Sequence, residues 1–156
     1  MSDPSSRMAD MSNSTTPDEA PNPATSVPAS EPDPTLGAFV AAAERRGSEE
    51  AFGVPVTLWV GGTIVTGLIQ NRRYWAKAIL AGLDEGATFG FDRLLEVWEE
   101  AEASDPDHEN RVYTFVHLTE ARTFMGSQFV PESPTMPWRG RLDAIDGWTF
   151  GTLTSE

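Results

Sequence analysis

Apolar residues near the start of the folded region predict a helix. Between Leu36 and Ala43 they recur at intervals of three and four residues, which is typical of one face of a helix. An Asp-Pro pair precedes this stretch and a glycine follows it, as expected for a helix start and a helix end. We therefore expect a first helix over residues 34–46.

The next apolar residues predict a β-hairpin. Residues 54–60 and 63–69 are rich in β-branched side chains, and only Gly61-Gly62 separates them. Two glycines tolerate the positive φ angles of a two-residue turn. Because strand residues alternate between faces, Trp59 lies on the face opposite the valines of its strand, and we expect it to be partly exposed.

The middle of the chain predicts two helices. Residues 74–80 indicate a short helix that packs its aromatic pair on the hairpin. Residues 84–109 hold ten acidic residues and one basic residue, yet apolar residues keep a helical spacing among them. The acidic face is either a solvated surface or a docking surface for a basic partner. The apolar residues are Phe91, Leu94, Leu95 and Trp98, and the acidic face comprises Glu96, Glu99, Glu100 and Glu102.

The C-terminal third predicts further strands. Residues 113–118 alternate as in a strand, Thr119-Glu120 is a candidate turn, and residues 121–125 could return as a short strand. Three prolines make residues 126–137 an irregular loop. Residues 138–145 and 148–153 flank Asp146-Gly147, a pair suited to a type I′ turn, and indicate a second hairpin.

Together these elements predict an α+β, β-rich fold. We expect a small, strongly bent antiparallel sheet or an Sm/SH3-like barrel of about five strands, with an N-terminal helix and a helical insertion. We assign residues 34–156 to one such domain. Residues 1–33 hold six of the twelve prolines and no aromatic residue, so we expect them to form a disordered acidic tail.

Composition narrows the classes of function. The net charge of -13 disfavours nucleic acid and anionic lipid as partners. No stretch approaches the roughly 18 consecutive apolar residues of a membrane span, and no signal peptide is evident, so we expect a cytoplasmic protein. There is no cysteine and there are only two histidines, so we expect neither a metal site nor a cofactor.

The residues offer little for catalysis. His117 lies within a predicted strand, where a packed structural role is the simplest interpretation, and His108 lies in an exposed acidic loop. A small hydrolase would need a pocket that joins His117 to a nucleophile and a carboxylate. We expect no catalytic residue and a protein that is not an enzyme.

Aromatic residues are the strongest candidates for an interaction surface. The chain has five tryptophans, which is many for so small a core, and aromatic residues are enriched at protein interfaces. The candidate interaction residues are Trp59, Trp138, Arg139 and Trp148.

A set of short motifs resembles the gas vesicle accessory protein U family. The resemblance covers roughly residues 36–154, and the Trp-Arg-Gly-Arg-Leu stretch with the following Ile-Asp-Gly is its most specific part. The motif positions, which we interpret as defining the fold, are Gly62, Gly67, His117, Leu118, Trp138, Arg139, Gly140, Asp146 and Gly147.

The resemblance implies a non-enzymatic accessory protein that associates with gas vesicles and promotes their clustering. Its partners would be the vesicle shell, other gas vesicle proteins or further copies of itself. The acidic tail is not part of the family's shared core. An Sm-like nucleic-acid-binding module and a general protein-interaction module are the alternative interpretations.

Overall fold

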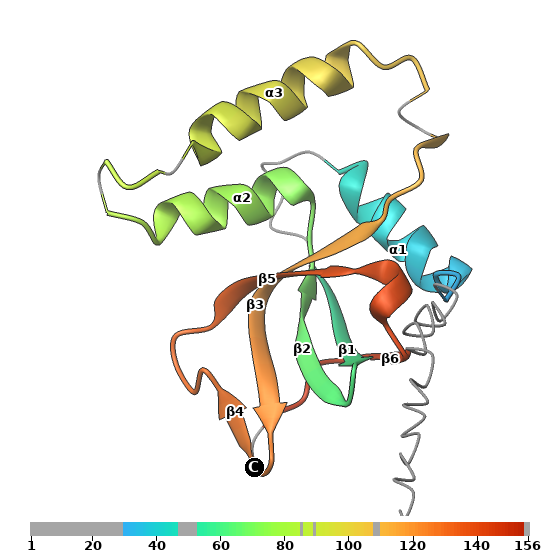
Figure 1. Cartoon of the computed structure of the whole chain (residues 1–156), viewed down its shortest axis with the longest axis vertical. Helices are drawn as coiled ribbons and strands as arrows, with labels where there is room; N and C mark the ends of the chain where they lie inside the picture. The colour runs from blue at the N-terminus through green and yellow to red at the C-terminus, as the bar shows by residue number, and fades with distance from the viewer. Residues whose placement is uncertain (1–29, 47–52, 85, 89, 108–109, 155–156) are drawn as a thin grey trace, which may run out of the picture.

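The computed structural model describes residues 30–46, 53–84, 86–88, 90–107 and 110–154 (Figure 1). Most of the expected acidic tail and His108 lie outside these residues.

The described part of the chain has three α-helices, six strands and a short 3-10 helix, which confirms the α+β class. In chain order these elements are α1 (Pro34–Glu44), β1 (Val54–Val60), β2 (Thr63–Ile69), α2 (Arg72–Ala81), α3 (Phe91–Ala103), β3 (Phe115–Met125), β4 (Gln128–Val130), β5 (Met136–Arg141), η2 (Leu142–Ala144) and β6 (Gly147–Phe150).

The strands form one antiparallel sheet that stays open, so the expectation of a closed Sm/SH3-like barrel of five strands was wrong. The order is β4-β3-β2-β1-β6, and β5 pairs with a different part of β3. Among the described residues, β6 pairs only with β1 and β4 only with β3, so both ends of the sheet remain edges. The bent sheet that we also expected is the alternative that agrees with this topology.

The first hairpin is confirmed. Strands β1 and β2 pair over their whole length, from Val54 opposite Ile69 to Val60 opposite Thr63. Gly61 and Gly62 have φ angles of 56° and 80°, the conformation that only glycine adopts without strain.

The prediction of a turn at Thr119-Glu120 was wrong, because β3 continues through these residues as one strand. The register with β2 and with β5 shifts there, which identifies a β-bulge, and Glu120 has a φ angle of 52°. Gly67 faces this bulge. A Cβ atom at Gly67 would lie 3.0 Å from the carbonyl oxygen of Thr119, so a larger residue would crowd the bulge.

The prediction of a second hairpin over residues 138–153 was also wrong. Strand β5 pairs with β3 and strand β6 pairs with β1, and η2 joins them. The Asp146 side chain accepts a hydrogen bond of 2.7 Å from the backbone N–H of Gly61, so it braces the first hairpin turn. The expected loop over residues 126–137 contains strand β4 and the start of β5.

The core lies between α1 and one face of the sheet. Helix α1 buries Leu36, Val40 and Ala43, and its first turn is capped by Asp33, which accepts hydrogen bonds from the N–H groups of Thr35 and Leu36. The buried residues of the sheet that complete the core are Val56, Leu58, Val65, Ile69, Val116, Leu118 and Ala121, with Leu142 from η2.

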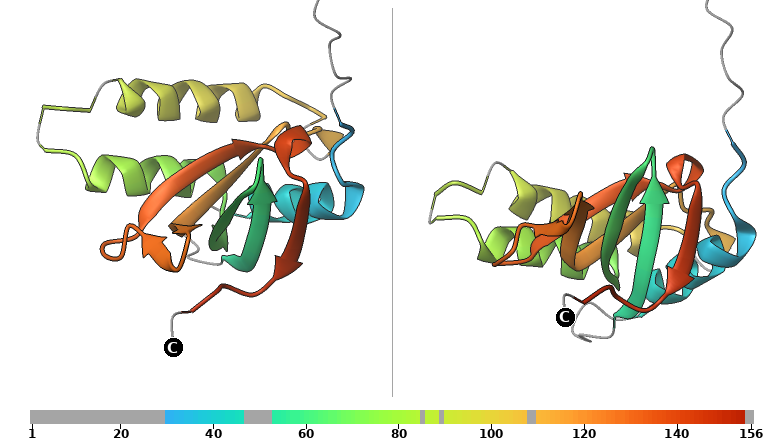
Figure 2. Two further views of the ribbon diagram at one scale, coloured as in Figure 1. Left: turned by 60° about the horizontal axis from the view of Figure 1, so that its bottom comes forward. Right: turned by 90° about the horizontal axis from the view of Figure 1, so that it is seen from below.

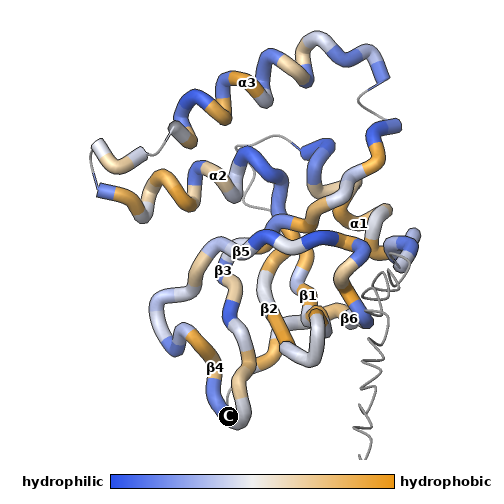
Figure 3. Tube along the Cα trace, viewed as in Figure 1, coloured by the Kyte–Doolittle hydropathy of each residue, from blue (hydrophilic) through white to orange (hydrophobic). Residues whose placement is uncertain are grey.

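Helices α2 and α3 lie side by side at one end of the sheet (Figure 2). Helix α2 contacts β3 and β5, whereas α3 contacts α2 and has no buried residue. Hydrophilic and hydrophobic segments alternate along α3 (Figure 3), as its predicted amphipathic pattern requires. Helix α3 is therefore an outer layer held through α2.

Candidate functional site

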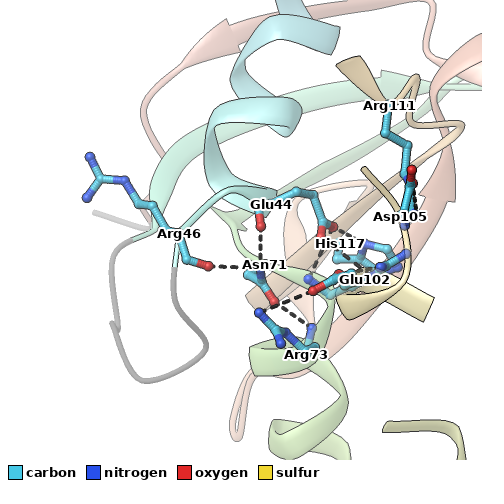
Figure 4. A network of polar contacts seen from close by, with 9 residues as sticks. Glu44, Arg46, Asn71, Arg73, Glu102, Asp105, Arg111 and His117 are labelled. Carbon is cyan, nitrogen blue, oxygen red and sulfur yellow. Dashed lines mark hydrogen bonds and ion pairs between the residues drawn. The ribbon is translucent and has the colours of Figure 1, made fainter. Parts of the chain in front are cut away.

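A buried acidic residue ends the first helix. Glu44 is only 6% exposed, and its Oε1 accepts a hydrogen bond of 3.1 Å from the backbone N–H of Arg72. The same oxygen lies 3.3 Å from Nδ1 of His117, while Oε2 lies 3.8 Å from Nε of Arg72. One carboxylate thus connects α1, the start of α2 and strand β3 (Figure 4).

Asn71 joins the same two helices through its side chain. Its Nδ2 donates to the backbone oxygens of Glu44 and Arg46, at 2.7 and 3.1 Å. Its Oδ1 accepts from the N–H of Arg73 at 2.8 Å and so caps α2. One amide therefore satisfies carbonyl groups at the end of α1 and an N–H group at the start of α2. We call Glu44, Asn71, Arg72 and His117 the polar junction.

Ion pairs tie α3 to this junction. Arg72 and Arg73 both pair with Glu102, and the guanidinium of Arg72 lies 5.3 Å from the ring centroid of Trp98. Glu102 therefore points toward α2 rather than outward, which corrects its assignment to the acidic outer face. Glu96, Glu99 and Glu100 are exposed, as predicted.

A cavity of about 250 Å³ lies against the polar junction. Three arginines, Arg72, Arg111 and Arg139, line it, and Glu44 and His117 form part of its wall. We call it the arginine pocket. Its other lining residues are Trp98, Val112, Tyr113, Thr114 and Phe115. The pKa of the Tyr113 hydroxyl is raised, mainly because the group is partly buried.

His117 is packed as predicted, but its ring nitrogens are not satisfied. The ring lies 4.9 Å from that of Trp75, between centroids, and it is 5% exposed. Neither of its nitrogens has a hydrogen-bond partner in the described part of the chain. No described hydroxyl is therefore placed to be activated by His117, as the hydrolase alternative would need.

The four candidate interaction residues do not lie together. Trp59 is 39% exposed, as expected. Trp138 and Trp148 are partly buried and pack against the core, and Arg139 lies over the ring of Phe115, with its Cζ 3.7 Å from the ring centroid. Their role in an interaction remains a prediction.

Trp59 belongs to an apolar row that runs across four strands. Trp59 is opposite Ile64, Ile64 is opposite Phe124, and Phe124 is opposite Phe129. Residues directly opposite each other in a sheet share a face, so these four side chains form a continuous row. We call them the sheet-face row. The sequence pattern did not reveal Phe124 and Phe129, because the β3–β4 pairing was not predicted.

A second group of aromatic rings lies on the other face, at the edge strand. Phe39, Trp148 and Phe150 contact one another edge to face, with centroids 4.9 to 5.9 Å apart. Phe150 is 55% exposed. Trp148 is opposite Leu58 and so shares its face, whereas Trp59 points to the opposite face. We call these three residues the edge cluster.

The remaining motif positions lie in the core, in a turn, at a strand end or at a close contact. Leu118 is fully buried, and Gly140 lies beneath the ring of Trp138, where a Cβ atom would lie 2.1 Å from the nearest ring carbon. Gly62 forms the hairpin turn, and Gly147 begins β6 opposite Trp59.

Sequence reasoning missed Glu44 and Asn71. A usable signal existed for Glu44, because Leu36, Val40 and Glu44 are spaced four residues apart and therefore share one helix face. An acidic residue that continues an apolar face needs a buried partner. Nothing in the local sequence indicated that this partner would be His117, which is far away in the chain.

In the residues that the structure describes, no group of three histidine, aspartate or glutamate side chains is arranged to hold a metal ion. The helices in the same residues are too short or too polar to span a bilayer.

The chain matches the model of a known protein family. The family model described as "Gas vesicle protein GvpU-like" matches residues 33–153, which cover every helix and strand from α1 to β6. The comparisons with curated proteins and with solved structures gave no match.

Proposed function

Because the chain belongs to the GvpU-like gas vesicle protein family, we propose that it is a non-catalytic accessory protein that associates with gas vesicles and promotes their clustering. The family match over residues 33–153 is the observation that carries this proposal. It includes every described helix and strand, which supports assigning the family's role to the folded part of the chain.

We assign the contact with the vesicle shell to the sheet-face row. Trp59, at 39% exposed, presents an aromatic surface there. Exposed apolar area of this kind is typical of protein contact sites. An uncharged contact surface also avoids repulsion in a chain whose net charge is -13.

To cluster vesicles, one protein molecule or one protein oligomer needs at least two adhesive contacts. The edge cluster supports a second contact, because Trp148 and Phe150 share the sheet face opposite to that of Trp59. One molecule could thus hold a shell with one face and a second molecule or shell with the other.

A flotation assay tests the shell contact. Purified full-length protein is mixed with intact gas vesicles, the vesicles are floated, and bound protein is measured across a concentration series. We expect Trp59→Ser to weaken apparent affinity by about tenfold, because an interface tryptophan often supplies a large share of the binding energy.

The matched control is Val97→Ser on α3, where an apolar side chain is 43% exposed and lies outside both aromatic groups. This variant should bind as the unchanged protein does. Equal weakening by Val97→Ser and Trp59→Ser would contradict the assignment to the sheet-face row, and absence of binding by the unchanged protein would contradict the proposed function.

A further inference from the structure

The outer edge of strand β6 leaves backbone groups without partners. In the described part of the chain β6 pairs only with β1 and ends the order of the sheet. The N–H of Gly151 donates to the carbonyl oxygen of Pro55 at 2.9 Å, and hydrogen-bonded residues alternate along an antiparallel ladder. Thr149 therefore bonds to β1, whereas Trp148 and Phe150 direct their backbone N–H and C=O groups away from it. Neither of these two residues has another backbone partner among the described residues.

The other free edges of the sheet carry features that discourage pairing with another chain, and β6 lacks them. Natural sheets protect exposed edges with charged residues and prolines. Strand β5 contains Pro137 and two arginines, and β4 is followed directly by Pro131. Strand β6 reads Gly-Trp-Thr-Phe, without a charge or a proline, and its Phe150 is 55% exposed. The edge of β6 is therefore the one that is open to a further strand.

We propose that β6 pairs with β6 of a second copy of this chain, antiparallel about a two-fold axis, so that two sheets become one. The edge is self-complementary, because Trp148 lies opposite Phe150 of the second copy and each such pair exchanges both backbone hydrogen bonds. The rings of Trp148 and Phe150, whose centroids are 5.1 Å apart, share one face and meet the same two rings of the second copy. The dimer thus extends the edge cluster across the axis.

The charge distribution favours this edge for self-association. Copies of a chain with a net charge of -13 repel each other, and residues 147–151 bring no charged side chain to the axis. The dimer also carries two sheet-face rows, one on each copy, which are the two adhesive contacts that clustering needs. This last step rests on the proposed function, whereas the pairing itself can be measured without vesicles.

Sedimentation velocity of the full-length protein tests the pairing. Over a concentration series from about 1 μM to about 1 mM, we expect the mass to rise from that of one chain toward that of two. A short strand edge buries little surface, so the dimer should form only as the concentration rises. A monomer at every concentration would overturn the proposal.

Two substitutions of Phe150 separate backbone pairing from ring contacts. Phe150→Pro and Phe150→Val both lose the ring, but only proline also loses the N–H that donates across the axis. Edge strands tolerate proline where the N–H faces solvent, so β6 should remain paired with β1, and thermal melting checks this. The proline variant should associate at least about tenfold more weakly than the valine variant, since each copy loses a hydrogen bond. Equal association of the two variants would overturn the strand pairing.

A cysteine at the axis tests the register. In the proposed pairing Thr149 lies opposite Thr149 of the second copy, as a non-hydrogen-bonded pair with Cα atoms roughly 4.5 Å apart. A disulfide spans this distance, and the chain has no cysteine of its own to compete.

Thr149→Cys should therefore form disulfide-linked dimers under mild oxidation at least about tenfold faster than Val97→Cys, because pairing raises the effective concentration of the two thiols. Val97 is 43% exposed and lies on α3, away from the axis. Equal rates for the two variants would mean that only random collisions link the chains and would overturn the proposal.

Vesicle experiments keep this proposal apart from the proposed function. Phe150→Pro leaves the sheet-face row unchanged, so this variant should still float with gas vesicles but should no longer cluster them. Clusters that grow equally with Phe150→Pro would overturn the dimer as the clustering device. Absence of vesicle binding by an unchanged protein that still dimerises would contradict the proposed function and leave the dimer standing.

Discussion

At the scale of single residues, Gly140 decides how Trp138 packs. A Cβ atom at Gly140 would overlap the Trp138 ring, so Gly140→Ala should displace the ring and lower the free energy of unfolding by about 1–3 kcal/mol. Gly37, within α1, has no atom within 4 Å of the position of an added Cβ atom. Gly37→Ala should instead raise stability by about 0.5–1 kcal/mol, because glycine is unfavourable inside a helix.

Urea denaturation of both variants measures this contrast. A neutral Gly140→Ala variant would show that the strand tolerates a methyl group there, and the packing role of Gly140 would be wrong.

The cap of α1 gives a pH dependence. The hydrogen bond from the backbone N–H of Leu36 is the main reason that the pKa of the Asp33 carboxyl lies below 3.8, and burial opposes this lowering. A group whose pKa is lower in the folded state than in the unfolded state stabilises the fold at pH values above its unfolded-state pKa. This stabilisation is lost as the pH falls through the folded-state pKa. The contribution of Asp33 should therefore be present at neutral pH, begin to fall near about pH 4 and disappear only below the lowered pKa of the folded state.

Melting temperatures of Asp33→Ala and Asp33→Asn across pH 2–7 check this. The alanine variant should melt at a lower temperature than the unchanged protein at pH 7, and the two should converge at low pH. Asparagine can cap without charge, so its variant should lose less stability at neutral pH. A constant difference between the alanine variant and the unchanged protein at every pH would contradict the account.

The residues of the polar junction show what a sequence pattern can reveal. The spacing of Leu36, Val40 and Glu44 places Glu44 on the buried face of α1, so burial of the acid could have been foreseen. Its neighbours could not, because His117 and Asn71 reach it only through long-range folding. The arginine pocket has the same origin, since Arg72, Arg111 and Arg139 come from distant segments.

At the scale of elements, local patterns predicted α1, α2, the amphipathic α3 and the first hairpin, because each is defined by residues close in sequence. The errors occurred where pairing is long-range. Thr119-Glu120 has the composition of a turn. Because β3 pairs with β2 and β5 on both sides of these residues, they form a β-bulge within one strand instead. Asp146-Gly147 also has turn composition, but the strand that follows it, β6, pairs with the distant β1 instead of with β5.

The attachment of α3 depends on a few side chains, because the helix has no buried residue. Glu102→Gln removes the charge that pairs with Arg72 and Arg73. Since this ion pair is partly shielded from water, we expect amide exchange in α3 to become faster by about tenfold, with little change in β1 and β2.

Hydrogen exchange followed by mass spectrometry measures this effect. Glu99→Gln, on the exposed face of the same helix, serves as the control and should leave exchange unchanged. Uniformly faster exchange across the sheet after Glu102→Gln would contradict the view of α3 as a separately attached layer.

At the scale of the whole molecule, the open sheet matters for function. A closed barrel would hide one sheet face, whereas the open sheet leaves the sheet-face row and the edge cluster on opposite sides of β1 and β6. The α+β class and the bent sheet could be predicted from sequence. The openness could not, because it depends on long-range pairing: β6 pairs with β1 and β5 with β3, but β5 and β6 do not pair with each other to close the sheet.

The family match gives a prediction about the N-terminal segment. It begins at residue 33, and all described helices and strands lie within it. Deleting residues 1–29 should therefore leave the melting temperature of the protein unchanged, and a scanning calorimetry trace of both chains would show it. A large decrease would mean that the segment contributes to the fold.

The central claim is that this chain associates with gas vesicles and clusters them. The most direct measurement follows vesicle cluster size by dynamic light scattering while purified full-length protein is added to intact vesicles, with vesicle-bound protein measured in parallel. The account predicts that protein binds and that clusters grow with the amount bound. Vesicles that remain dispersed and carry no protein at any concentration would contradict it.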